Sequence, residues 1–122
     1  MQIRASAEDY LETILLLSKK TGSVRSIDIV EEMGFSKPSV SVAMKKLRED
    51  ELIQMDEDGF IRLTEKGKVV AEQVYERHST LYDWLTRNGV SERQAAMDAC
   101  RMEHILSEET FDMIKRLVEQ GA

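Results

Sequence analysis

The sequence predicts a mostly α-helical protein, with an N-terminal winged helix-turn-helix over residues 1–64 and a C-terminal helical region over residues 65–122. Three observations predict this fold. Apolar residues recur at helical spacing through most of the chain. A short helix, a turn containing glycine and a capped second helix follow one another in the first half. Two short apolar runs then flank an acidic turn that ends in glycine, which is typical of a β-hairpin.

The first half contains three expected helices, over residues 7–20, 26–33 and 36–50. A serine, which is a favoured N-cap residue, stands at the start of each helix: Ser6, Ser26 and Ser36. The spacing of apolar residues predicts which side chains face the core. These are Tyr10, Leu11, Ile14, Leu15 and Leu17 in the first helix, Ile27, Val30 and either Met33 or Ile29 in the second, and Val40, Met44 and Leu47 in the third.

The hairpin is expected over residues 52–63, and three further helices over residues 64–87, 91–104 and 107–119. Thr64, Ser91 and Ser107 stand at the starts of these helices. One stripe of the long helix contains the residues expected to face inward, which are Val70, Val74, His78, Leu81 and Leu85. The expected order of elements is therefore α-α-α-β-β-α-α-α.

Composition excludes several classes of protein. The 122 residues contain no apolar run near the roughly 20 residues that a membrane span needs. Three acidic residues, Glu8, Asp9 and Glu12, interrupt any apolar core of a secretory signal peptide. The single cysteine, Cys100, cannot form an intrachain disulfide. A cytoplasmic protein is therefore expected.

Charge is distributed unevenly along the chain. The formal net charge is −6, but phosphate contacts depend on where the positive charge lies. Residues 19–48 contain three acidic residues and seven basic ones, which are Lys19, Lys20, Arg25, Lys37, Lys45, Lys46 and Arg48. This segment could therefore bind nucleic acid although the chain is acidic.

The helix over residues 36–50 is the expected DNA-reading element, because the second helix of a helix-turn-helix enters the major groove. Short polar residues in its first turn would let it approach closely, and Val42 could contact thymine methyl groups. The acidic turn of the hairpin predicts only weak contact with phosphate. The expected DNA-binding residues are Arg25, Ser36, Lys37, Pro38, Ser39, Ser41, Val42, Lys45 and Lys46. The alternative is that these helices and the hairpin form a module for protein contacts.

A second group of residues has the chemistry of metal ligands. Cys100, Glu103 and His104 have the spacing i, i+3 and i+4, so they share one helix face. Asp9 and Glu12 lie one turn apart on the first helix, and His78 lies on an apolar stripe. Carboxylate and imidazole suit Mn²⁺ and Fe²⁺, whereas thiolate shifts the preference toward Fe²⁺, Co²⁺ or Zn²⁺.

Each candidate ligand also has a structural interpretation. Asp9 and Glu12 could only complement the dipole of the first helix. A single histidine on an apolar face is usually a satisfied core residue, and a single cysteine usually packs as a small hydrophobic side chain. The pair at positions 103 and 104 could be a solvated helix end.

The chain resembles the diphtheria-toxin-repressor family of metal-dependent regulators, and in particular its short manganese-transport-regulator branch. The resemblance covers essentially all 122 residues. The segments that carry it are EDYLE at 8–12, SKPSVS at 36–41, LTEKG at 63–67, RH at 77–78 and CRMEHILS at 100–107. It implies a homodimer with a helical dimerisation and metal-binding region. The homodimer would bind palindromic operators in double-stranded DNA when loaded with Mn²⁺ or Fe²⁺ and repress metal-uptake genes.

The resemblance also implies a ligand set, which is Asp9, Glu12, His78, Glu103 and His104. Cys100 takes a position that is glutamate in the manganese branch and cysteine in the iron branch, whereas Asp9 follows the manganese pattern. Tyr82 and Ala96 stand where the iron branch completes an ancillary site, and neither is a good ligand. The number of ions per subunit stays open, and no SH3-like domain of the iron type is expected to take part.

These observations lead to a hypothesis in which metal fixes the DNA-binding half relative to the C-terminal half. The first helix supplies Asp9 and Glu12, and the C-terminal helices supply the other ligands. A regulator that senses redox state or another ligand through Cys100 is the alternative. An enzyme is not expected, because the sequence has no HExxH and no nucleophile motif.

Overall fold

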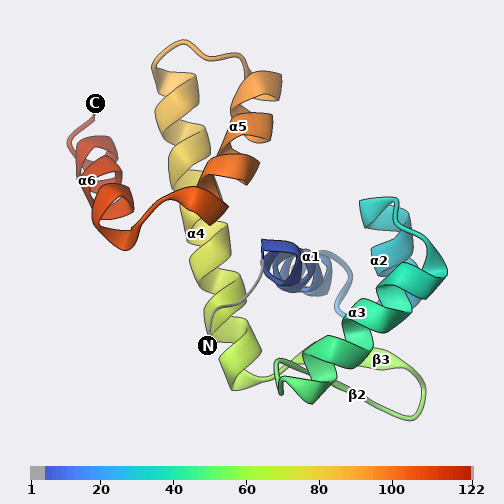
Figure 1. Ribbon diagram of the computed structural model, residues 1–122. Helices are drawn as coiled ribbons and strands as arrows, with labels where there is room; N and C mark the ends of the chain where they lie inside the picture. The colour runs from blue at the N-terminus through green and yellow to red at the C-terminus, as the bar shows by residue number, and fades with distance from the viewer. Residues whose placement is uncertain (1–4, 122) are drawn as a thin grey trace. The chain divides into compact units, whose positions relative to one another are not determined.

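The computed structural model describes residues 5–121 and divides into two compact units, one up to Glu72 and one from Gln73 (Figure 1). The long helix α4 (Glu65–Arg87) continues from the first unit into the second.

The first unit is a winged helix-turn-helix, as the sequence predicts. It contains α1 (Ala5–Thr21), β1 (Val24–Arg25), α2 (Ser26–Met33), α3 (Lys37–Glu49), β2 (Ile53–Met55), β3 (Phe60–Leu63) and the start of α4. The three strands form an antiparallel sheet in the order β1-β3-β2. The strand β1 is absent from the predicted order, because two residues are too short to show a period.

The core of the first unit follows the predicted apolar faces of α1 and α3. Every residue predicted to face inward on these two helices is buried. In α2 the prediction for Ile27 is wrong, because this residue is 43% exposed. Of the two alternatives Met33 and Ile29, Ile29 is the fully buried one. An eight-residue helix has only two turns, so its periodicity defines the inward face poorly.

Two of the predicted helix starts in this unit are also wrong. Ser6 lies inside α1, which begins at Ala5. Arg25, not Ser26, is the N-cap of α2, and its backbone N–H donates to the carboxylate of Asp28 over 2.9 Å. The third start is confirmed, because the Ser36 hydroxyl accepts a hydrogen bond from the Ser39 backbone N–H at the start of α3.

The start of α4 packs directly against the backbone between α3 and β2. The Thr64 hydroxyl donates to the Glu51 carbonyl over 2.7 Å and accepts from the Gly67 N–H over 3.0 Å. A Cβ atom on Gly67 would lie 1.9 Å from the Leu52 carbonyl oxygen. Glycine at this position therefore lets the helix approach the backbone of Leu52, directly before β2.

The second unit contains the rest of α4, together with α5 (Glu92–Ile105) and α6 (Glu108–Glu119). Its core centres on Leu81, Ala99 and Ile114, one residue from each helix. The predicted caps Ser91 and Ser107 are confirmed, since each hydroxyl accepts from the backbone N–H three residues ahead. None of the described helices is long and apolar enough to cross a membrane.

Candidate metal centre

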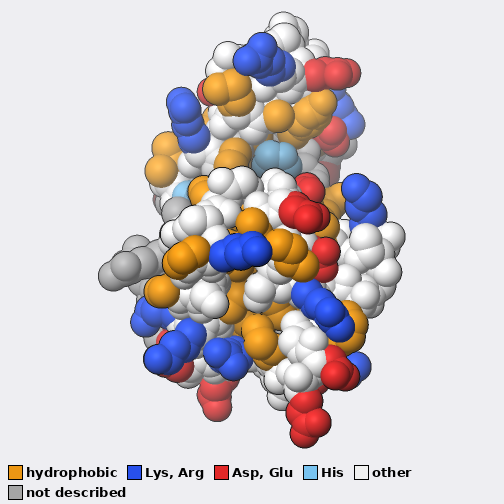
Figure 2. Space-filling view, turned by 90° about the vertical axis from the view of Figure 1, so that its right-hand side faces the viewer, with side chains coloured by type: hydrophobic (Ala, Val, Ile, Leu, Met, Phe, Trp, Pro, Cys, Tyr) orange, Lys and Arg blue, Asp and Glu red, His pale blue; other side chains and the backbone are white. Residues whose placement is uncertain are grey.

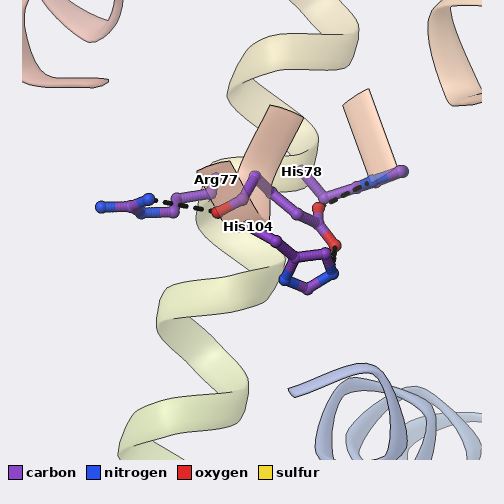
Figure 3. A network of polar contacts seen from close by, with 4 residues as sticks. Arg77, His78 and His104 are labelled. Atoms are coloured by element: carbon purple, nitrogen blue, oxygen red, sulfur yellow. Dashed lines mark hydrogen bonds and ion pairs between the residues drawn. The ribbon is translucent and has the colours of Figure 1, made fainter. Parts of the chain in front are cut away.

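A buried carboxylate lies at the centre of the candidate site. Glu103 is in the last turn of α5, and only 3% of the residue is exposed. Its Oε2 lies 3.1 Å from Nδ1 of His78 on α4, and its Oε1 lies 3.4 Å from Nε2 of the neighbouring His104 (Figure 3). Two imidazoles from two helices therefore face one carboxylate.

One oxygen of this carboxylate lacks a hydrogen bond. Among the described residues, Glu103 Oε1 has no hydrogen-bond partner, although His104 lies near enough for electrostatic attraction. Buried polar atoms are rarely left in this state, because desolvation without a partner costs free energy. A divalent cation would supply what this oxygen lacks, so the local structure fits a metal ligand.

Cys100 adds a thiol to this group from one turn earlier on α5. It offers a sulfur, Glu103 a carboxylate oxygen and His104 a ring nitrogen, and these three atoms all lie within 4.8 Å of one another. Cys100 is exposed, so the interpretation of this residue as a small core side chain is wrong. The burial of Glu103 likewise excludes a solvated helix end at position 103.

Arg77 supports the same turn of α5, although it is not among the residues predicted to form the site. Its Nη1 donates to the backbone carbonyls of Glu103 over 3.1 Å and Leu106 over 2.9 Å. Figure 3 shows the Arg77 and His78 side chains extending from α4, and a dashed line marks the contact of Arg77 with the Glu103 carbonyl. The signals in the sequence are that Arg77 directly precedes a candidate ligand and belongs to the segment RH at 77–78.

The remaining predicted ligands, Asp9 and Glu12, belong to the first unit. They lie one turn apart on α1, and both are partly buried. Whether they share an ion with the residues of the second unit stays a prediction.

The predicted DNA-reading surface is accessible. Every residue predicted for DNA contact on α3 and its cap is exposed, and Val42 is 70% exposed. Arg25 is also exposed, and its guanidinium carbon lies 4.2 Å from the ring centroid of Phe60 on β3. On the face that Figure 2 shows, lysine and arginine side chains lie among both hydrophobic and acidic ones.

The acidic turn between β2 and β3 has a structural role. Asp56 Oδ1 accepts hydrogen bonds from the backbone N–H groups of Asp58 and Phe60, each over 2.9 Å. This carboxylate therefore shapes the wing tip by forming an Asx-type turn.

Comparison with known proteins identifies both halves of the chain. Residues 2–61 match the iron dependent repressor, N-terminal DNA binding domain, and residues 64–121 match its metal binding and dimerisation domain. The transcriptional regulator MntR of Escherichia coli O6:H1 is 34% identical over 117 residues, which are 96% of this chain and 76% of that protein. The chain belongs to the iron-dependent repressor family.

Solved structures of the iron-dependent repressor fold agree with this assignment. The manganese regulator SloR is 27% identical with a TM-score of 0.82, over 93% of this chain and 53% of that one. A manganese-dependent transcriptional repressor in complex with manganese is 25% identical with a TM-score of 0.84, over 93% of this chain and 52% of that one. The chain thus spans about half the length of these repressors.

Membership in the iron-dependent repressor family confirms the predicted class of protein. The family consists of metal-dependent transcriptional regulators with an N-terminal DNA-binding domain and a C-terminal domain for metal binding and dimerisation. The chain is a regulator and not an enzyme. The comparisons give no support to a redox sensor built on Cys100.

Proposed function

We propose that this iron-dependent repressor homologue is a repressor activated by Mn²⁺ or Fe²⁺ that binds palindromic operator DNA as a homodimer and controls metal-uptake genes. The observation that carries the proposal is the buried Glu103 carboxylate, which faces two imidazoles and has one oxygen that accepts no hydrogen bond from residues 5–121. These neighbours favour a role for the carboxylate as a metal ligand over a role in a purely structural ion pair.

The proposed ligands come from both units. The second unit supplies four of the proposed ligands, which are His78, Cys100, Glu103 and His104. The first unit supplies the other two, Asp9 and Glu12. The support for the first unit's share is that two partly buried carboxylates lie one helical turn apart, so both can face one ion. When bound, the cation supplies positive charge that offsets these carboxylates.

Metal binding by these residues would be coupled to DNA binding in the following way. Without an ion, the carboxylates of Asp9, Glu12 and Glu103 would repel one another on approach, and α1 would not be held to the second unit. Ligation of one ion by both sets of residues would remove that repulsion. The ion can shift the equilibrium only by its preference for the DNA-competent state.

In the proposed dimer, that state places two copies of α3 about one DNA turn apart, about 34 Å. The exposed short residues at the start of α3 and the exposed Val42 would then contact bases, and Lys45 and Lys46 would contact phosphates. Two-fold symmetry of the protein predicts a palindromic operator.

The test begins with selection of operator sequences from random duplex DNA in the presence of Mn²⁺. The selected DNA is then titrated with the protein under anaerobic conditions, with Mn²⁺, Fe²⁺, Co²⁺ or Zn²⁺, and with EDTA. We expect palindromic sequences to be selected, and chelation to reduce their affinity at least tenfold. The same affinity with and without EDTA would exclude the proposal.

Substitutions test which residues are responsible for the response of DNA binding to metal. Glu103→Ala and His104→Ala should remove the response to metal, and Asp9→Ala and Glu12→Ala should weaken it. Glu109→Ala, which removes an exposed carboxylate from α6, is the matched control and should respond as the parent does. Cys100→Ser tests the redox alternative, because a thiol sensor would lose its response completely, whereas a metal sensor would keep part of it.

A further inference from the structure

The guanidinium of Arg77 holds the turn of α5 from which the proposed ligand Glu103 projects. A helix leaves its last carbonyls without intrahelical partners. At the end of α5, the Leu106 N–H satisfies the Met102 carbonyl, and Arg77 Nη1 donates to the carbonyls of Glu103 and Leu106. The positively charged guanidinium of Arg77 also lies at the C-terminal end of α5, where the helix dipole is negative.

The same side chain reaches α6. The guanidinium carbon lies 5.1 Å from the ring centroid of Phe111, within range of a cation–π interaction. Phe111 is 6% exposed and lies in the first turn of α6. One side chain of α4 therefore contacts the end of α5, the loop that follows it and the start of α6.

Two consecutive residues of α4 thus fix Glu103 in two ways. His78 contacts the carboxylate at Oε2 over 3.1 Å, and Arg77 contacts the backbone carbonyl of the same residue over 3.1 Å. The carboxylate is buried, so a small rotation of its backbone would move both oxygens relative to His78 on α4. Contacts that restrain this backbone, such as those of Arg77, therefore restrict the direction of the carboxylate.

We propose that Arg77 is a positioning residue of the metal centre, which sets the direction of the Glu103 carboxylate without touching the ion. This inference rests on the proposed function, since it assumes that Glu103 is a ligand. Groups that orient ligands commonly contribute 10–100-fold to metal affinity. Arginine suits the task because its planar fork can reach two carbonyls and stays charged at all relevant pH values.

The test uses Arg77→Met and Arg77→Lys in the full chain. Affinity for Mn²⁺ and Co²⁺ is measured by competition with a chromophoric chelator, and the visible spectrum of the Co²⁺ form reports ligand geometry. Arg77→Met should lower both affinities at least tenfold and change the Co²⁺ spectrum. Arg77→Lys, which keeps one charged donor, should recover part of the affinity and remains informative if Arg77→Met does not fold.

Arg87→Met is the matched control. Arg87 also donates Nη1 to a backbone carbonyl near the end of a helix, that of Val118 in α6, over 3.2 Å. The Arg87→Met variant should lose some thermal stability but keep the parent's metal affinity and Co²⁺ spectrum. A purely structural role for Arg77 would lower the melting temperature in both variants and change metal affinity in neither.

The outcomes separate the two proposals. If the parent binds neither Mn²⁺ nor Co²⁺, the proposed function and this inference both fail. If the parent binds them and Arg77→Met binds within threefold of the parent with the same spectrum, only the role of Arg77 is overturned. Equal losses in Arg77→Met and Arg87→Met would overturn it as well.

Discussion

At the scale of single residues, the molecule keeps a carboxylate where a carboxylate is unfavourable. Glu103 is buried, and its Oε1 lacks a hydrogen bond among the described residues. A buried acceptor of this kind costs about 1–3 kcal/mol. Such a cost is expected at sites whose residues serve a ligand and not the fold.

Replacement of Glu103 by glutamine should therefore separate stability from metal binding. The amide keeps the size of the side chain and removes its charge, so the metal-free variant should be at least as stable as the metal-free parent. The rise in melting temperature on addition of Mn²⁺ should disappear. Thermal unfolding with Mn²⁺ and with EDTA measures both effects, and a retained rise with Mn²⁺ would contradict the ligand assignment.

A second residue-scale prediction concerns pH. Burial raises the pKa of Tyr10 above its ordinary value of 10.0, because the ionised form is poorly solvated in the core. The folded pKa lies above the unfolded one, so the neutral hydroxyl stabilises the fold fully below about pH 10, and this contribution is lost as the pH rises through the folded pKa.

Tyr10→Phe removes that titration. Chemical denaturation between pH 8 and pH 11 should show a smaller alkaline loss of unfolding free energy in the variant than in the parent. The same alkaline loss in both proteins would show that ionisation of Tyr10 is not coupled to unfolding.

At the scale of elements, α3 presents an apolar residue to solvent among positive ones. Val42 is 70% exposed, and Lys45 and Lys46 lie one turn further along the helix. Exposed valine contributes nothing to the core of the first unit, whose α3 residues are Val40, Met44 and Leu47. A surface role at Val42 is therefore open to direct test.

Val42→Glu should lower affinity for the selected operator at least tenfold, because a carboxylate would face DNA phosphates and lose the methyl contact. Its effect on unfolding should stay within about 0.5 kcal/mol, as for other surface substitutions. Val69→Glu, at a 54% exposed valine on α4, is the control and should bind as the parent does. Equal affinities in the two variants would remove α3 from the reading surface.

A second prediction at this scale concerns the start of α4, where alanine in place of glycine should lower stability although alanine has the higher helix propensity. Alanine normally stabilises a helix over glycine by about 1 kcal/mol. At Gly67 a Cβ would overlap the Leu52 carbonyl oxygen at 1.9 Å, and this oxygen belongs to the backbone and cannot rotate away. Gly67→Ala should therefore destabilise the protein by about 1–3 kcal/mol in urea denaturation. An unchanged or raised stability would show that α4 can shift.

At the scale of the whole molecule, an acidic protein presents a basic segment to its proposed partner. The net charge is −6, yet residues 19–48 hold seven basic residues against three acidic ones. Each phosphate contact releases counterions, so the logarithm of affinity falls with the logarithm of salt concentration by about 0.9 per contact.

Substitution of both lysines of α3, Lys45→Gln and Lys46→Gln, should reduce the salt slope of operator binding by about 2. Affinity would fall by a similar factor for all DNA sequences, since phosphate contacts carry no sequence information. Arg93→Gln, at an exposed position on α5, should leave the slope unchanged. A slope that changes equally in both variants would indicate a general effect of net charge.

The sequence predicts most of the fold because its helices are long enough to show a period. The buried stripe of α3 and the serine caps at Ser36, Ser91 and Ser107 are read directly from local spacing. The strand β1 is missed because its two residues pair with β3, which is distant in sequence.

The candidate site is predicted only in part. Residues one turn apart on α5 share a face by helix geometry alone, so Cys100, Glu103 and His104 are found together. The contacts of Arg77 join residues 26 and 29 positions apart through backbone carbonyls, which every residue possesses. No side-chain type in the sequence identifies such acceptors, so this interaction appears only in three dimensions.

The exposure of Cys100 beside a buried carboxylate has a consequence for metal selectivity. In the proposed centre, the soft sulfur of Cys100 is open to solvent, whereas the hard oxygens of Glu103 are buried. A thiolate ligand would favour thiophilic ions such as Zn²⁺ and Cd²⁺ over Mn²⁺. Protein prepared without chelator treatment should therefore carry contaminating zinc, and its apparent metal selectivity would reflect purification history as well as equilibrium.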